Sequence, residues 1–140
     1  MKDTNNLLDY NIWSGTDYNN DITGFSKTPT LSNEYSSIGE NSLKLTRTRD
    51  DYNNYTTEHM KSLPSNNYRL TVDVYSPKSG GNLVMFTGDT DQVNVVFNPS
   101  PHVQSLSLQA NNTTFRGFRL LNYTKGQGIW WDNISLVTVQ

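Results

Sequence analysis

Few side chains of this sequence have the type and spacing that catalysis requires. The two histidines, His59 and His102, lie far apart, and no HxH or HxxxH spacing is present. Hydrolytic zinc sites need clusters of such ligands, and cysteine nucleophiles are excluded because the chain has no cysteine. No GxSxG motif and no glycine-rich phosphate loop occurs either. Two of the 13 acidic residues could still converge for glycoside hydrolysis, so a hydrolase stays a hypothesis.

The side chains fit sugar recognition better. Aromatic rings stack on the CH-rich faces of sugar rings while planar polar groups bond the hydroxyls, and the chain has eight Tyr and three Trp. The informative residues are expected opposite the apolar face of their strands, or at the rim formed by region 49–58. On strands these are Trp130, Tyr75, Arg69 and Arg119, and at the rim they are Tyr55 and Tyr52. For each of them alone, a surface or inter-sheet role without any ligand is the alternative.

Two further motifs have ordinary explanations. Asp89-Thr90-Asp91 has the alternating acids of a calcium loop but lacks the remaining EF-hand positions, so a hairpin turn is the alternative. Triplets of the form Asn-X-Ser/Thr can accept glycans in secreted proteins, but with 18 Asn in the chain several arise by chance. They begin at Asn54, Asn111, Asn112, Asn122 and Asn133.

Strands are expected to position these side chains, because period-two alternation bounded by Gly, Pro, Asn and Ser dominates the sequence. Residues 68–74 alternate most clearly, which predicts that Tyr68, Leu70, Val72 and Val74 are buried. About nine strands are predicted, at residues 7–13, 42–47, 55–60, 68–74, 83–87, 93–97, 103–110, 115–121 and 129–139. Many short strands with regular turns indicate an antiparallel sandwich or barrel. The length predicts one domain over residues 1–140.

Two places depart from the regular pattern. The segment 14–39 is polar with little alternation, and a loop of that length is usually functional or poorly ordered. In the last strand Trp131, Ile134 and Leu136 face inward, although the first step is three residues rather than two. A β-bulge at Asp132-Asn133 restores the phase. The alternative is an ordinary strand with Trp130 and Trp131 on its two faces.

Charge and hydropathy exclude several partners. The formal net charge is −2 and the isoelectric point is near 5.5, whereas nucleic-acid binders show a basic stripe. No apolar run approaches the roughly 20 residues that span a bilayer, so membrane insertion is not expected. The first residues open onto no hydrophobic stretch, which predicts that no signal peptide is present. The chain is then intracellular or, as we prefer, a domain excised from a longer extracellular or cell-surface protein.

Four segments occur together in a recognisable order. They are Asn6-Leu7-Leu8, Gly39 to Thr46, Tyr68 to Tyr75, and Trp131-Asp132-Asn133-Ile134-Ser135-Leu136. In order and spacing, the sequence resembles the galactose-binding-like jelly-roll carbohydrate-binding modules that accompany glycoside hydrolases and surface proteins. The resemblance implies a two-sheet antiparallel jelly-roll β-sandwich and a non-catalytic role.

The resemblance also implies one structural calcium ion. Asp132 matches the family's carboxylate ligand, and Glu40 and Ser42 match the loop that joins the chain ends in that site. Asp9 is a plausible amino-terminal contributor, although the segment Asp9 to Trp13 is compressed relative to the family pattern. Calcium prefers such oxygen ligands. The alternative is that Asp132 caps the bulge by hydrogen bonding while Glu40 is solvated.

These observations favour a non-catalytic module that tethers a larger extracellular protein to a polysaccharide or cell-wall glycan. The second hypothesis is a structural or adhesion domain of a cell-surface or virion tail protein without sugar affinity. The third is the hydrolase with convergent carboxylates. Fold does not fix function, so the site has to decide among them.

Overall fold

The computed structural model describes residues 30–37, 42–47 and 54–140, with the backbone alone at residues 30, 31 and 54–61. This part of the chain consists of strands and loops and contains no helix. Among these residues there is accordingly no helix of the length and apolarity needed to cross a membrane. The strands are β1 (Thr30–Ser32), β2 (Ser42–Thr46), β3 (Asn54–Tyr75), β4 (Gly81–Thr87), β5 (Asp91–Phe97), β6 (Gln104–Asn122) and β7 (Gly128–Thr138).

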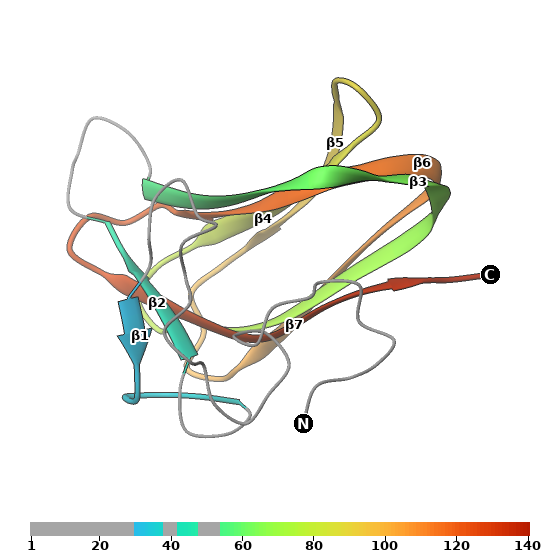
Figure 1. Cartoon of the computed structure of the whole chain (residues 1–140). Coiled ribbons are helices and arrows are strands. Elements are labelled where there is room, and N and C mark those ends of the chain that lie inside the picture. Colours follow the sequence, from blue (N-terminus) through green and yellow to red (C-terminus); the bar gives the residue numbers. More distant parts are fainter. Residues whose placement is uncertain (1–29, 38–41, 48–53) are drawn as a thin grey trace.

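The seven strands form one antiparallel hydrogen-bonded sheet in the order β1-β2-β7-β3-β6-β4-β5. The long strands β3 and β6 pair with each other, and their register shifts several times between His59 and Tyr68. Figure 1 shows that both strands bend in this region and pass from one layer to the other. The sheet thus folds over on itself, which confirms the predicted all-β antiparallel sandwich of two layers.

In Figure 1 the strands divide between an upper layer and a lower layer. The lower layer contains β1, β2, β7, the second half of β3 and the first half of β6. The upper layer contains the first half of β3, the second half of β6, β4 and β5. Because side chains alternate across each strand, every strand gives one face to the interior and one to the surface.

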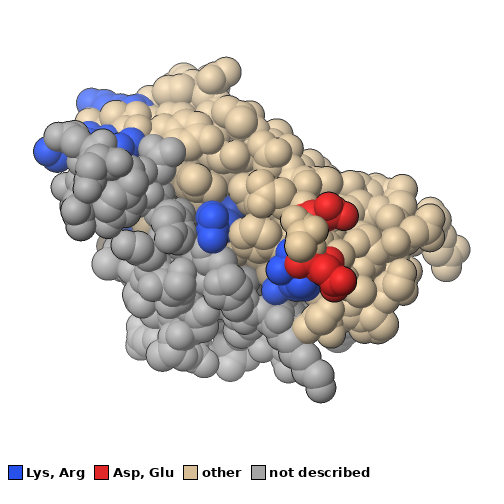
Figure 2. Space-filling model, turned by 90° about the horizontal axis from the view of Figure 1, so that it is seen from above, with Lys and Arg blue, Asp and Glu red and all other residues tan. Residues whose placement is uncertain are grey.

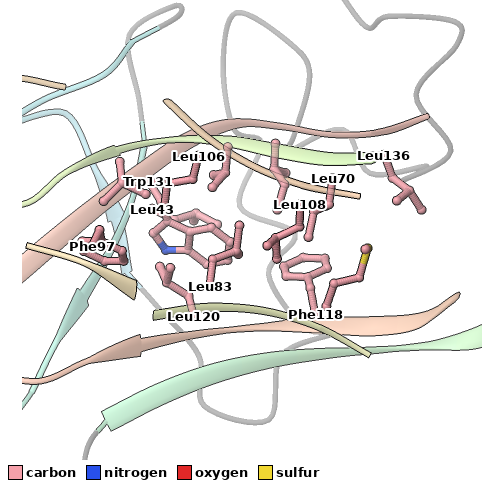
Figure 3. Packing of buried hydrophobic residues seen from close by; sticks show 14 of the residues in the cluster. Leu43, Leu70, Leu83, Phe97, Leu106, Leu108, Phe118, Leu120, Trp131 and Leu136 are labelled. Carbon is pink, nitrogen blue, oxygen red and sulfur yellow. The ribbon is translucent and has the colours of Figure 1, made fainter. Parts of the chain in front are cut away.

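The core lies between the layers and is built from their inward-facing side chains. Figure 3 shows the Trp131 indole among side chains such as Leu43, Leu83 and Leu120, which come from both layers. Trp131 is 0% exposed and meets Phe118 edge-on, with ring centroids 6.1 Å apart. Burying one large apolar side chain contributes about 1.5–3 kcal/mol, so this layer of contacts is the main force that holds the sandwich closed.

The predicted number of about nine strands is wrong for the described residues. The predicted strands 55–60 and 68–74 are one strand, β3, and 103–110 and 115–121 are one strand, β6. Pro64 and the Asn111-Asn112 pair bend these strands through register shifts without ending their pairing. The predicted strand 7–13 lies outside the described residues, while β1 forms inside the predicted loop 14–39.

Of the two alternatives for the last strand, the structure shows the bulge. The register runs from Asp73 opposite Asp132 to Thr71 opposite Ser135, so β7 has one residue more than β3 between these pairs. Asn133 adopts φ 53, in the left-handed region where Asn is tolerated better than other side chains. The bulge returns Ile134 to the core, where it is 0% exposed.

Candidate functional site

Trp130 and Tyr75 lie opposite each other on β7 and β3, on the outer face of the lower layer. Their ring centroids are 5.8 Å apart and their planes are inclined by 40°. Each is half-buried, while the neighbouring side chains Trp131 and Val74 point into the core. The sequence pattern therefore predicted their shared face.

Tyr35, which the sequence analysis did not single out, covers Tyr75. The two rings stack with centroids 4.0 Å apart and an angle of 22°. Burial raises the pKa of the Tyr35 hydroxyl, and the nearby Tyr75, Asp73 and Asp132 raise it further. Tyr35 lies in the predicted loop 14–39, where no alternation marked it. We call Tyr35, Tyr75 and Trp130 the aromatic row.

Polar contacts tie the segment around Tyr35 to the sheet. The Ser37 N–H donates to Asp132 Oδ2 at 2.9 Å. The Ser37 hydroxyl lies 2.8 Å from Asp73 Oδ2 and 3.4 Å from Asp132 Oδ2. These bonds hold the segment after β1 against β3 and β7, which keeps the Tyr35 ring in place over Tyr75.

A charged pair flanks the other end of the aromatic row. Lys44, opposite Trp130 on β2, places its ammonium 4.7 Å from the indole centroid, within cation–π range. The same ammonium lies 2.9 Å from Glu34, and this hydrogen bond lowers the pKa of the Glu34 carboxyl. The Trp130 Nε1–H donates to Ser32 Oγ at 3.2 Å. The result is an aromatic surface with hydrogen-bonding groups at its rim.

Hydrogen-bonded polar side chains cover the rest of this outer face. Asp73 accepts hydrogen bonds from Ser105 Oγ at 2.9 Å and from Asn133 Nδ2 at 3.3 Å. Arg69 is exposed and donates to Gln109 Oε1 at 3.1 Å. Arg69 precedes Tyr75 by six residues, roughly 20 Å along an extended strand. The face therefore includes Arg69, but not as an immediate neighbour of the aromatic row.

The remaining residues predicted for sugar binding do not join this surface. Arg119 lies on the outer face of the upper layer, with its guanidinium carbon 5.2 Å from the Phe86 ring centroid. Tyr55 lies opposite Leu121 in the same layer, and its side chain is outside the described residues. Tyr52 is also outside them. The predicted set is thus divided between two faces, because period-two phase cannot tell which layer a strand joins.

The residues predicted to bind calcium show hydrogen bonding wherever they are described. Asp132 is 3% exposed and accepts the Ser37 N–H at Oδ2 and the Asn133 N–H at Oδ1, the latter at 2.8 Å. Ser42 is fully buried and donates to the carbonyl of Tyr35. Glu40 and Asp9 lie outside the described residues. In this arrangement Asp132 caps the bulge by hydrogen bonding. Calcium stays a prediction.

The described residues also bear on the hydrolase hypothesis. Among them no three His, Cys, Asp or Glu side chains gather where they could hold a metal ion. Asp73 and Asp132 are register partners, and the Ser37 hydroxyl lies near both carboxylates. Since Asp132 is 3% exposed, a substrate cannot reach this carboxylate, and we assign the pair a structural role.

Comparison with known proteins reveals likeness in structure alone. No protein-family model matches the sequence, and no curated protein matches it. Tailspike protein 4 of bacteriophage CBA120, in its enzymatically active domain, matches with a TM-score of 0.65 and 12% identity. This match covers 85% of the present chain and 20% of the tailspike chain, so the present chain spans about a fifth of the length of that chain.

For two further structures, the match covers most of the present chain and most of the other chain. A cyclase from Fischerella sp. TAU matches with a TM-score of 0.61 and 18% identity, covering 81% of this chain and 71% of that one. The xylan-binding domain of family 22 matches with a TM-score of 0.60 and 12% identity, covering 86% and 90%. Modules of families 6, 29 and 61 match as well. The chain has the jelly-roll fold of carbohydrate-binding modules. At such low identities the likeness establishes the fold and leaves the ligand to the site.

Proposed function

We propose that this chain is a non-catalytic carbohydrate-binding module that tethers a larger protein to a polysaccharide or cell-wall glycan. The observation that supports this function best is the aromatic row on the outer face of the lower layer. The jelly-roll fold shared with modules of several carbohydrate-binding families supports it too.

The chemistry of the aromatic row suits a sugar ring. Trp130 and Tyr35 supply flat apolar surface against which a pyranose stacks. Tyr35 takes the outer position predicted for Tyr75, because it covers that ring. The Lys44 ammonium and the Glu34 carboxylate, 2.9 Å apart, act as donor and acceptor for sugar hydroxyls. Apolar contact with few oriented polar groups is the usual composition of small-ligand sites.

We further propose that the domain works outside the cell as part of a longer chain. Two similar structures support membership of a longer chain by their size. The present chain corresponds to 20% of the tailspike chain. It corresponds to 26% of a Clostridium thermocellum xylanase chain that contains a family 22 module and a GH10 module.

Affinity electrophoresis against a panel of soluble polysaccharides tests the proposed function. The wild-type chain is expected to be retarded by at least one polysaccharide, and Trp130→Ala and Tyr35→Ala are expected to lose most of that retardation. The matched control is Val96→Ala, since Val96 is 58% exposed on β5 and far from the aromatic row in the strand order. Equal retardation of all four proteins would place any binding elsewhere.

A second candidate function is a structural domain of a virion tail or adhesion protein. The match to the bacteriophage tailspike favours it. This function requires no sugar affinity, so the absence of retardation across the whole panel would support it and reject the carbohydrate-binding function.

A further inference from the structure

A bulge in β6 brings Arg116 and Arg119 to the same outer face of the upper layer. Phe115 and Phe118 are both fully buried although they are three residues apart, an interval that would put them on opposite faces of a regular strand. The register with β4 shifts between Phe86 and Thr87, and Gly117 adopts φ 145, where a side chain is disfavoured. The same shift turns both arginines outward.

Both guanidinium groups lie over one aromatic ring, that of Phe86. Phe86, on the neighbouring strand β4, is opposite Gly117, between the two arginines. The guanidinium carbon of Arg119 lies 5.2 Å from the Phe86 ring centroid, and that of Arg116 lies 5.8 Å from it. Both distances are within cation–π range. Two like charges are therefore kept near each other on one surface, which we call the Arg–Phe surface (Phe86, Arg116 and Arg119).

Arg116 forms no ion pair within the described part of the chain, although Asp91, whose backbone it contacts, is itself acidic. Its Nη2 donates to the carbonyl of Asp91 at 3.4 Å, which is a backbone acceptor without net charge. Its Nε is buried and has no hydrogen-bond partner among the described residues. Figure 2, which looks onto the top of the molecule, shows basic side chains at separate places on a largely uncharged surface, and one group of acidic side chains lies directly against one of them.

We propose that the Arg–Phe surface binds the acidic groups of a charged polysaccharide, either carboxylates or sulfate esters. This inference rests on the proposed carbohydrate-binding function and adds a second surface, on the layer opposite the aromatic row, that would contact a charged glycan. The planar guanidinium fork matches such oxyanions with two parallel hydrogen bonds. The net charge of the chain is −2, so an anionic polymer is not attracted by the molecule as a whole. Selectivity for an acidic glycan therefore depends on this local pair of arginines.

The test compares charged polymers with their neutral counterparts. Polygalacturonate is paired with its methyl ester, and carrageenan with agarose, in affinity electrophoresis and calorimetry at low salt. Wild type is expected to prefer at least one charged member by tenfold or more, and the pair concerned tells carboxylate from sulfate. Arg116→Gln and Arg119→Gln are expected to abolish the preference without altering any binding to the neutral polymer.

Two variants keep the result interpretable. Lys78→Gln removes one positive charge from an exposed residue away from the Arg–Phe surface and is expected to keep the preference. Arg119→Lys keeps the charge and loses the fork, and is expected to weaken binding by several-fold even if the glutamine variants fail to fold.

Several results would overturn the inference. These are no preference for either charged polymer, an equal loss in Lys78→Gln, or binding to single-stranded DNA as strong as to the charged glycans. If a neutral glycan binds through the aromatic row and charge adds nothing, only this inference fails. If no polysaccharide of any kind binds, the proposed function fails with it.

Discussion

The ring of Tyr35 stacks on the ring of Tyr75 at a centroid distance of 4.0 Å, although the two residues lie far apart in the sequence. The contact closes the segment after β1 over the outer face of the lower layer. It also buries the Tyr35 hydroxyl near Asp73 and Asp132, which raises its pKa above the ordinary value of 10.0. The aromatic row is therefore expected to affect both the binding of a ligand and the stability of the fold at alkaline pH.

Stability is expected to fall at alkaline pH, in part through Tyr35. Because its pKa is raised in the folded state, the folded protein holds this proton at a pH where the unfolded chain has lost it. The contribution of Tyr35 to the free energy of unfolding is fully present below about pH 10 and declines above it. In Tyr35→Phe, which keeps the stacked ring, urea titrations from about pH 9 to about pH 11 should show a smaller decline. An identical decline in both proteins would contradict the raised pKa.

The positive φ of Asn133 at the bulge predicts that two substitutions of this residue differ in their effect on stability. Asn133→Gly should stay within about 0.5 kcal/mol of wild type, because Gly adopts φ 53 freely. Asn133→Val should cost about 1–2 kcal/mol, because a β-branched side chain is strained there. Ser135→Val is the control, since Ser135 is in the regular part of β7 after the bulge. Chemical denaturation measures all three. Equal costs for Gly and Val would mean that Asn133 is not held at positive φ.

Asn122 is a buried polar group whose hydrogen bonds join three parts of the fold. It is 0% exposed, donates to the carbonyls of Leu45 at 3.0 Å and Gln127 at 2.7 Å, and accepts from Ser79 Oγ at 2.6 Å. Asn122→Leu leaves these buried groups without partners and should cost at least about 2 kcal/mol, seen as a lower urea midpoint.

The control for this prediction is Asn94→Ala. Asn94 is exposed and makes one amide–amide bond at 3.2 Å, so its loss should cost less than about 0.5 kcal/mol. Equal costs for the two variants would show that the Asn122 bonds contribute little to stability.

The sequence predicted what period-two alternation encodes and missed what long-range contacts decide. It placed Tyr68, Leu70 and Trp131 in the core, because local phase alone determines those positions. It offered the bulge at Asp132-Asn133 as one of two alternatives for the last strand. It missed Tyr35, since no local pattern distinguishes an aromatic residue that meets a strand from far along the chain.

The same limit explains two further differences. Alternation gave Arg69 and Arg119 the same outward phase, but the bends in β3 and β6 put them on different layers. The sequence could not tell which Asn-X-Ser/Thr triplets arise by chance, and the folded chain buries the side chain of Asn122 completely. Both outcomes depend on packing between distant segments.

Calcium binding remains a prediction and is decided by thermal unfolding. If an ion binds the native state through Asp132, the melting temperature must fall in EGTA and recover with added calcium by mass action. Asp132→Asn, which is nearly the same size, should lose that difference. A melting temperature that is the same in EGTA and calcium would leave Asp132 with the hydrogen-bonding role that it has at the bulge.

The central claim is that a glycan binds at the aromatic row, and the indole N–H signals in a nitrogen-15 correlation spectrum test it most directly. Trp130→Phe identifies the signal of Trp130, whose Nε1–H meets Ser32 Oγ on the outer face. Trp131 is 0% exposed in the core and serves as the internal control. On titration with a polysaccharide that retards the wild type, the Trp130 signal should move and that of Trp131 should not. A Trp130 signal that stays in place at saturating glycan would contradict the account.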